Sequence, residues 1–186
     1  MSNRRKWVFA IALTAIVATL VVRYRSYNTR EFTGGLYMRD DGAFAYPRYR
    51  AEIGYIPLRE PGEYTFNVSG LPQASMDFAL QVPNATQTDR DRLTSLSTSV
   101  GILIMGPSRA TLCQMEGQLA DAKKRGPSSW VLSSSASHAE FWTPRCQEIR
   151  THPLGTYTVR VTVSGTDARA PERLLAVLKG GGNELP

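Results

Sequence analysis

The pattern of hydrophobic and polar residues changes once along the chain. The segment Trp7–Val22 is a run of 16 residues without a charge, in which only Thr14 and Thr19 are polar. A helix of that length spans about 24 Å, somewhat less than a bilayer hydrocarbon core of about 30 Å. An aromatic residue at each end suits the membrane interfaces, and the flanking Lys6 and Arg23 can extend to the headgroups. We therefore expect one transmembrane helix over about residues 7–24, in contact with membrane lipid.

Two other interpretations of this run stay open, a cleaved signal peptide and a buried helix of a soluble protein. A signal peptide needs small residues before its cleavage site, whereas this run ends Leu20-Val21-Val22 and passes directly into Arg23. A lipoprotein would need a cysteine there, and the first cysteine is Cys113. These features favour an uncleaved anchor.

The orientation of the anchor depends on the charges beside it. Three basic residues lie on each side of the run, and the short amino flank also carries the α-amine. Such a flank is easier to leave in the cytoplasm than to translocate. We therefore expect residues 1–30 to comprise a cytoplasmic tail, the anchor and a juxtamembrane linker. The rest would lie outside the cytoplasm, which in a bacterium means the periplasmic side of the inner membrane.

From Glu31 onward the hydrophobic pattern alternates with a period of two, as in half-buried strands. The clearest case is GTYTVRVTVS, Gly155–Ser164, with Tyr157 and three valines on one face. The other predicted strands are Leu36–Met38, Ala51–Ile56, Gly62–Ser69, Met76–Val82, Val100–Met105, Thr111–Leu119, Trp130–Ser133, Glu140–Trp142 and Leu174–Leu178.

Turn signals such as Pro61-Gly62 and Gly106-Pro107 separate these strands at the spacing typical of antiparallel sandwiches. The fold class predicted is therefore all-β, with one antiparallel β-sandwich, immunoglobulin-like or jelly-roll-like, over residues 31–179. The polar stretches Asn84–Arg92 and Asp121–Ser129 are expected to be exposed loops, and residues 180–186 a flexible tail.

Two segments of the body share the pattern Gly-x-Tyr-Thr-apolar-x-Val. One begins at Gly62 and the other at Gly155. The pattern is similar to the late strand of many immunoglobulin-like bacterial domains, in which a turn glycine precedes a tyrosine that corners the strand. The resemblance implies the architecture and identifies no family.

Charge and composition narrow the classes of function. The chain has 22 basic and 16 acidic residues, a net charge of +6. Residues 1–30 contain six of the basic residues and no acid, so residues 31–186 have 16 of each and a net charge of zero. A neutral body argues against a nucleic-acid partner, which requires clustered positive charge. The hydrophobic content of 42% excludes a disordered chain.

The only cysteines, Cys113 and Cys146, are candidates for a disulfide if the body lies in an oxidising compartment. The alternative is a pair of buried free thiols. No Cys and His spacing indicates zinc, and no motif indicates any other cofactor. Asp40 and Asp41 could contribute to a calcium site, but a turn explains Asp41-Gly42 without an ion.

Aromatic residues provide a candidate ligand face for a glycan or protein partner of the envelope, namely Trp130, Phe141 and Trp142. His138 lies near several serines and Glu140, which suggests a hydrolase as the alternative function, although no nucleophile-elbow motif is present. The sequence therefore predicts a membrane-anchored, non-enzymatic binding or structural module. The alternative is an envelope hydrolase that uses His138 with a nearby serine and acid.

Overall fold

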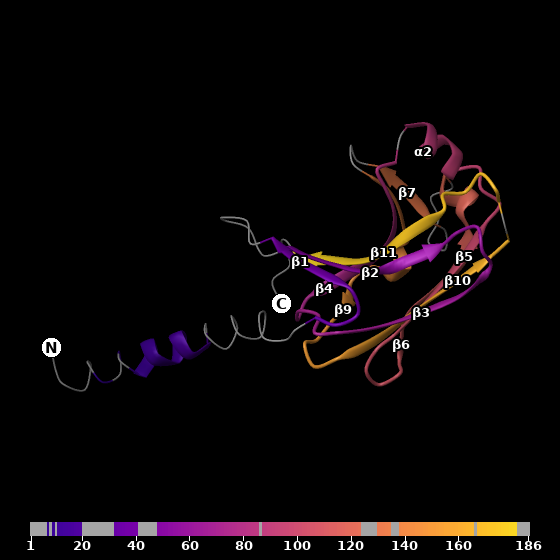
Figure 1. Cartoon of the computed structure of the whole chain (residues 1–186). Coiled ribbons are helices and arrows are strands. Elements are labelled where there is room, and N and C mark those ends of the chain that lie inside the picture. Colours follow the sequence, from indigo (N-terminus) through magenta and orange to yellow (C-terminus); the bar gives the residue numbers. More distant parts are fainter. Residues whose placement is uncertain are drawn as a thin grey trace.

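The computed structural model of the chain describes residues 7, 9, 11–19, 32–40, 48–85, 87–123, 130–134, 138–165 and 167–181. Within these ranges the strands form two antiparallel sheets that pack as a sandwich, as Figure 1 shows. The all-β fold expected from the alternating pattern is confirmed. Each predicted strand overlaps an observed one, and the short β9 lies where the pattern predicts none.

The larger sheet has the strand order β1-β2-β11-β4-β8-β7, with β9 paired to β4. All of its described pairings are antiparallel. Its strands are β1 (Leu36–Asp40), β2 (Arg48–Pro57), β4 (Ser75–Pro83), β7 (Val131–Ser134), β8 (His138–Trp142), β9 (Ile149–Arg150) and β11 (Arg173–Gly181).

The smaller sheet has the strand order β3-β10-β5-β6. Its strands are β3 (Gly62–Ser69), β5 (Ser99–Met105), β6 (Thr111–Gln118) and β10 (Thr156–Ser164). The helical elements between the strands are α2 (Gln87–Leu93), η1 (Leu119–Lys123) and η2 (Pro144–Cys146).

The core lies between the sheets and is built by the alternation that the sequence displays. On β10 the side chains of Tyr157, Val159, Val161 and Val163 are buried, while those between them are half-buried or exposed. On β4 the expected inward residues are buried, but so are Ala79 and Gln81, which the pattern placed outward. A central strand of the larger sheet is thus covered on both faces, so simple alternation fails there.

The two copies of the tyrosine pattern form neighbouring antiparallel strands, β3 and β10. In β10 the hydroxyl of Tyr157 accepts a hydrogen bond from the backbone N–H of His152, 2.7 Å away and five residues upstream. In β3 the hydroxyl of Tyr64 donates to the carbonyl of Glu60 at 3.0 Å. Each tyrosine therefore fixes the turn that leads into its own strand, as the immunoglobulin-like pattern implies.

Two segments that the sequence predicts to be irregular belong to regular elements in the structure. Most of the expected loop Asn84–Arg92 is helical, because α2 covers Gln87–Leu93. Gln, Arg and Leu favour helix, and the buried Leu93 anchors the helix in the core. Gly180 and Gly181 belong to β11 and not to a tail, because they continue its pairing with β2. Position 180 suits glycine, since a Cβ there would collide with the carbonyl oxygen of Ser75. Residues 124–129 and 182–186 lie outside the described residues.

The sandwich has two distinct ends. At the proximal end, Thr33 joins the end of β3 through two backbone hydrogen bonds with Ser69, of 3.1 and 3.2 Å. The same end holds the start of β2 and the end of β11. The distal end holds the end of β2, α2 and the loop between β10 and β11. Figure 1 shows α2 at the opposite end from β1 and β9.

The described residues of the amino-terminal run, 7, 9 and 11–19, are helical and exposed. Trp7 is 71% exposed and Phe9 69%. Within the described residues, no helix is both long and apolar enough to cross a membrane. The remainder of the segment expected over residues 7–24 lies outside the described part of the chain.

Candidate functional site

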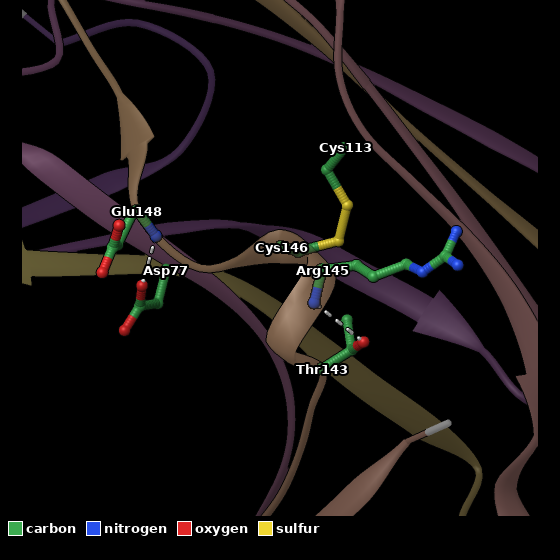
Figure 2. Close-up of a disulfide and its surroundings, with 6 residues drawn as sticks. All are labelled: Asp77, Cys113, Thr143, Arg145, Cys146 and Glu148. Carbon is green, nitrogen blue, oxygen red and sulfur yellow. Dashed lines mark hydrogen bonds between the residues drawn. A yellow bond between two sulfur atoms is a disulfide. The ribbon is translucent and has the colours of Figure 1, made fainter. Parts of the chain in front are cut away.

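The structure brings the two cysteines to disulfide distance, with Cα atoms 5.2 Å apart. Cys113 lies on β6, at the edge of the smaller sheet, and Cys146 lies in η2, which follows β8 of the larger sheet. Both side chains are buried. The pair therefore connects the two layers of the sandwich, as Figure 2 shows.

The segment that carries Cys146 is held at both of its ends (Figure 2). The hydroxyl of Thr143 accepts a long hydrogen bond from the N–H of Arg145, at 3.4 Å, in the manner of a helix cap. Beyond η2, the N–H of Glu148 donates to a carboxylate oxygen of Asp77 on β4, at 2.9 Å. These contacts hold Cys146 opposite β6.

The aromatic ligand face expected from the sequence does not form. Trp130 and Phe141 are fully buried and pack edge to face, with ring centroids 6.4 Å apart. The indole N–H of Trp130 donates to the carbonyl of Val100 on β5, at 3.2 Å. Trp142 is half-buried. Adjacent residues of a strand point to opposite faces, so Phe141 enters the core and Trp142 leaves it.

A group of polar side chains crosses the outer face of the larger sheet. We call it the outer polar network. Arg50 Nη2 on β2 donates to Gln81 Oε1 on β4 at 2.6 Å, and Gln81 Nε2 donates to Glu140 Oε2 on β8 at 2.7 Å. Lys179 on β11 pairs with the other oxygen of Glu140. His138 Nε2 lies 3.7 Å from Glu140 Oε2, so Glu140 is the acid that faces this histidine.

The burial of Glu140 explains why this network is so well connected. Its side chain is 5% exposed, whereas those of His138 and Lys179 are 32% and 41% exposed. A carboxylate withdrawn from water is tolerated only when hydrogen bonds and a positive charge compensate it. Gln81 and Lys179 provide that compensation. The carboxylate of Glu140 is therefore already engaged by groups other than His138.

A cavity of about 230 Å³ lies at the distal end. We call it the arginine pocket. Its polar lining consists of Arg59 after β2, Asp89 and Arg92 of α2, and Arg169 in the loop between β10 and β11. Its apolar lining consists of Val82, Ala170 and Pro171. The connections at this end thus place three arginine residues around one small cavity.

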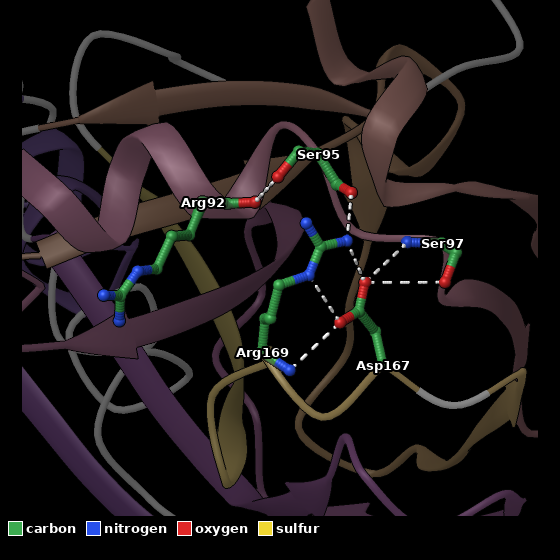
Figure 3. A network of polar contacts seen from close by, with 5 residues as sticks. All are labelled: Arg92, Ser95, Ser97, Asp167 and Arg169. Carbon is green, nitrogen blue, oxygen red and sulfur yellow. Dashed lines mark hydrogen bonds and ion pairs between the residues drawn. The ribbon is translucent and has the colours of Figure 1, made fainter.

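Arg169 is held by a network that Figure 3 shows. Its Nε and Nη2 atoms donate to the two carboxylate oxygens of Asp167, at 3.0 and 2.7 Å, and Nη2 also donates to the carbonyl of Ser95 at 3.2 Å. The backbone N–H groups of Arg169 and Ser97 donate to the same carboxylate. The hydrogen bonds from Arg169 hold the pKa of Asp167 well below its ordinary value.

This pKa shift predicts an acid dependence of stability. Because the pKa of Asp167 is lower in the folded chain than in the unfolded chain, its ionised carboxylate stabilises the fold. This stabilisation is complete above the unfolded pKa of about 4 and is lost as the pH falls below that value. We expect the urea midpoint of the wild type to fall more between pH 6 and pH 3 than that of Asp167→Asn. Urea denaturation at both pH values measures this difference.

Asp91, which is exposed on α2, offers the matched control. The variant Asp91→Asn should keep the wild-type decrease between pH 6 and pH 3. An equal decrease in the wild type and in Asp167→Asn would contradict the assigned role of the Asp167–Arg169 pair.

Sequence reasoning missed the arginine pocket because its residues are far apart in the chain and belong to no motif. Only the topology brings together the loop after β2, α2 and the loop before β11. For metal sites, the described residues contain no cluster of three or more His, Cys, Asp or Glu residues suited to an ion. Asp40 ends β1, whereas Asp41 and Gly42 lie outside the described residues.

Comparison with known proteins adds no family to these observations. No protein-family model matches the chain, and no curated protein is significantly similar to it.

Proposed function

We propose that the protein is a membrane-anchored, non-enzymatic binding or structural module whose β-sandwich lies outside the cytoplasm, in a bacterium on the periplasmic side of the inner membrane. The observation that carries this proposal is the exposed apolar helix before the sandwich. Residues 11–19 are helical, carry no charge and are all exposed. Apolar side chains on every face of a helix favour a lipid environment over water.

The cysteine pair supports the location of the body. A pair of buried cysteines at disulfide distance between two layers is typical of proteins that fold where disulfides persist. The neutral charge of residues 31–186 further supports a body that does not bind nucleic acid.

The tether to the membrane determines which surface would meet a partner. The chain joins the sandwich at the proximal end, beside Ser69. The ten residues of β2 extend about 33 Å from that end toward the distal end. The distal end, with the arginine pocket, would therefore be presented away from the bilayer. A protein or glycan of the envelope would reach this end most easily.

Membrane retention after alkaline carbonate washing tests the anchor. We expect the full chain to stay with the membranes, and the variant Leu13→Arg with Ile16→Arg to enter the soluble fraction. Each arginine at the centre of a membrane helix costs about 2.5–3.5 kcal/mol on insertion scales. The matched control, Leu13→Val with Ile16→Val, should stay with the membranes. Release of the wild type by carbonate would contradict the anchor.

A hydrolase is the second candidate, and one observation favours it. In the β7–β8 ladder, Ser133 lies directly opposite Glu140, and His138 is two residues away on the same strand. A serine, a histidine and an acid thus share one face of the sheet. Two observations argue against a hydrolase. The carboxylate of Glu140 is already bound by Lys179 and Gln81, and its Oε2 atom lies 3.7 Å from Nε2 of His138, beyond hydrogen-bond distance.

A fluorophosphonate probe, which labels activated serines, separates the two candidates. The binding-module proposal predicts no labelling of the full chain in membranes, while an active serine hydrolase added to the same sample is labelled. Labelling that disappears in both Ser133→Ala and His138→Ala would favour the hydrolase.

A further inference from the structure

The arginine pocket has a lining that is chemically unlike the rest of the neutral body. Its three arginine residues come from three separate segments, after β2, in α2 and before β11. The carboxylates of Asp89 and Asp167 offset two of the three charges, so the described lining and its support keep a formal surplus of one positive charge. A small cavity with such a surplus attracts an anion.

Two of the three arginine side chains are held by hydrogen bonds to neighbouring residues. Arg59 Nε donates to the carbonyl of Ala170 at 2.8 Å, and Arg169 is held by Asp167 and Ser95. Ordering a mobile arginine side chain on binding loses conformational entropy, and much of that loss is avoided where the side chain is already held. The pocket is therefore preorganised.

Arg92 completes the pocket from the side of the helix. Figure 3 shows its side chain extending from α2, with the guanidinium directed away from the Asp167 carboxylate that holds Arg169. The backbone carbonyl of Arg92 accepts hydrogen bonds from Ser95, but the Arg92 side chain takes no part in that clamp, although Arg92 lines the same cavity. Its guanidinium is the group whose removal should affect a bound anion without disturbing the Asp167–Arg169 pair.

We propose that the arginine pocket binds a compact oxyanion, a carboxylate or phosphate group that offers two oxygen atoms to the forked guanidinium groups. Planar guanidinium groups match carboxylate and phosphate in geometry as well as charge. The volume of about 230 Å³ is below the range of about 300–1,000 Å³ typical of drug-sized ligands, so the pocket suits a single anionic group or small diacid. The assignment names a ligand class for the proposed binding role and does not depend on the membrane anchor.

Thermal unfolding of the full chain in an uncharged detergent tests this assignment, with malonate and inorganic phosphate as probes. Sodium chloride keeps the ionic strength constant, so that general screening does not change. We expect a saturable rise in Tm with at least one probe, since a ligand that binds only the folded state stabilises it. A response to malonate alone identifies a carboxylate site, and a response to phosphate alone identifies a phosphate site.

Three variants localise the effect. Arg92→Gln and Arg59→Gln should each abolish most of the rise in Tm, and Arg92→Lys should weaken it because the fork is lost while the charge remains. The matched control is Arg150→Gln, at the exposed Arg150 of β9 near the proximal end, which should keep the full rise. No rise with either probe, or an equal rise in Arg92→Gln and Arg150→Gln, would overturn the proposal. Neither result would affect the membrane-retention test.

Discussion

Replacing Cys113 and Cys146 together by alanine is expected to lower the free energy of unfolding by roughly 3–4 kcal/mol, the value that chain entropy assigns to a loop of this length. The two residues are 33 positions apart and connect the edge of the smaller sheet to the segment after β8. A bond between them restricts the unfolded chain while the folded sandwich already holds the cysteines in place. Urea denaturation of both proteins under oxidising conditions measures the difference.

Reductant provides the control for the cysteine variant. Wild-type protein treated with dithiothreitol should unfold at a lower urea concentration than untreated protein, whereas the double variant should not respond. A thiol titration of the denatured wild type without reductant should find no reactive thiol. Two reactive thiols per chain would contradict the bond, and the support that the cysteines give to an oxidising compartment would be lost with it.

The variant Trp130→Ala is expected to lose about 3–5 kcal/mol of stability, the range for large aromatic residues removed from a core. Trp130 is fully buried, packs against Phe141 and donates a hydrogen bond to the carbonyl of Val100. Its removal leaves a cavity between the sheets. The carbonyl of Val100 also loses the hydrogen bond from the indole N–H. The free energy of unfolding from urea denaturation gives the value.

Trp142→Ala is the matched control, because Trp142 is only half-buried. Its side chain points out of the core, whereas that of Trp130 lies inside it. Its loss of stability should be clearly smaller than that of Trp130→Ala. Equal stability of Trp130→Ala and the wild type would contradict the core position of Trp130. It would then favour the exposed ligand face that the sequence suggests.

The strands of the body could be predicted because their alternation records which side chains are buried. The segment GTYTVRVTVS shows this clearly, since its Tyr157 and valines are the core residues of β10. The tyrosine pattern was equally informative, since the hydroxyl of Tyr157 holds the turn before its strand. Both features depend on neighbours that are close in sequence.

The aromatic face could not be judged from local pattern because aromatic residues suit both cores and ligand surfaces. Alternation does require Phe141 and Trp142 to point to opposite faces, so the two could never belong to one exposed face. The same limit applies to Gln81 and Glu140. The period of two places them on the outer face, but only the strand order shows that they meet there.

The arginine pocket depends still more on topology. Arg59, Arg92 and Arg169 are separated by long stretches of chain and lie outside the strands. Their residue type suggests only a solvated surface. They surround a cavity because the loop after β2, the helix α2 and the loop before β11 meet at the distal end of the sandwich.

The location of the C-terminal end tests the central claim most directly, namely that a helix anchors the sandwich outside the cytoplasm. Alkaline phosphatase, which needs disulfides for activity, and a fluorescent protein that matures in the cytoplasm would each be fused after Pro186 in full-length chains. We predict phosphatase activity and no fluorescence from membrane-bound protein. Fluorescence with an inactive phosphatase would place the sandwich in the cytoplasm and contradict the account.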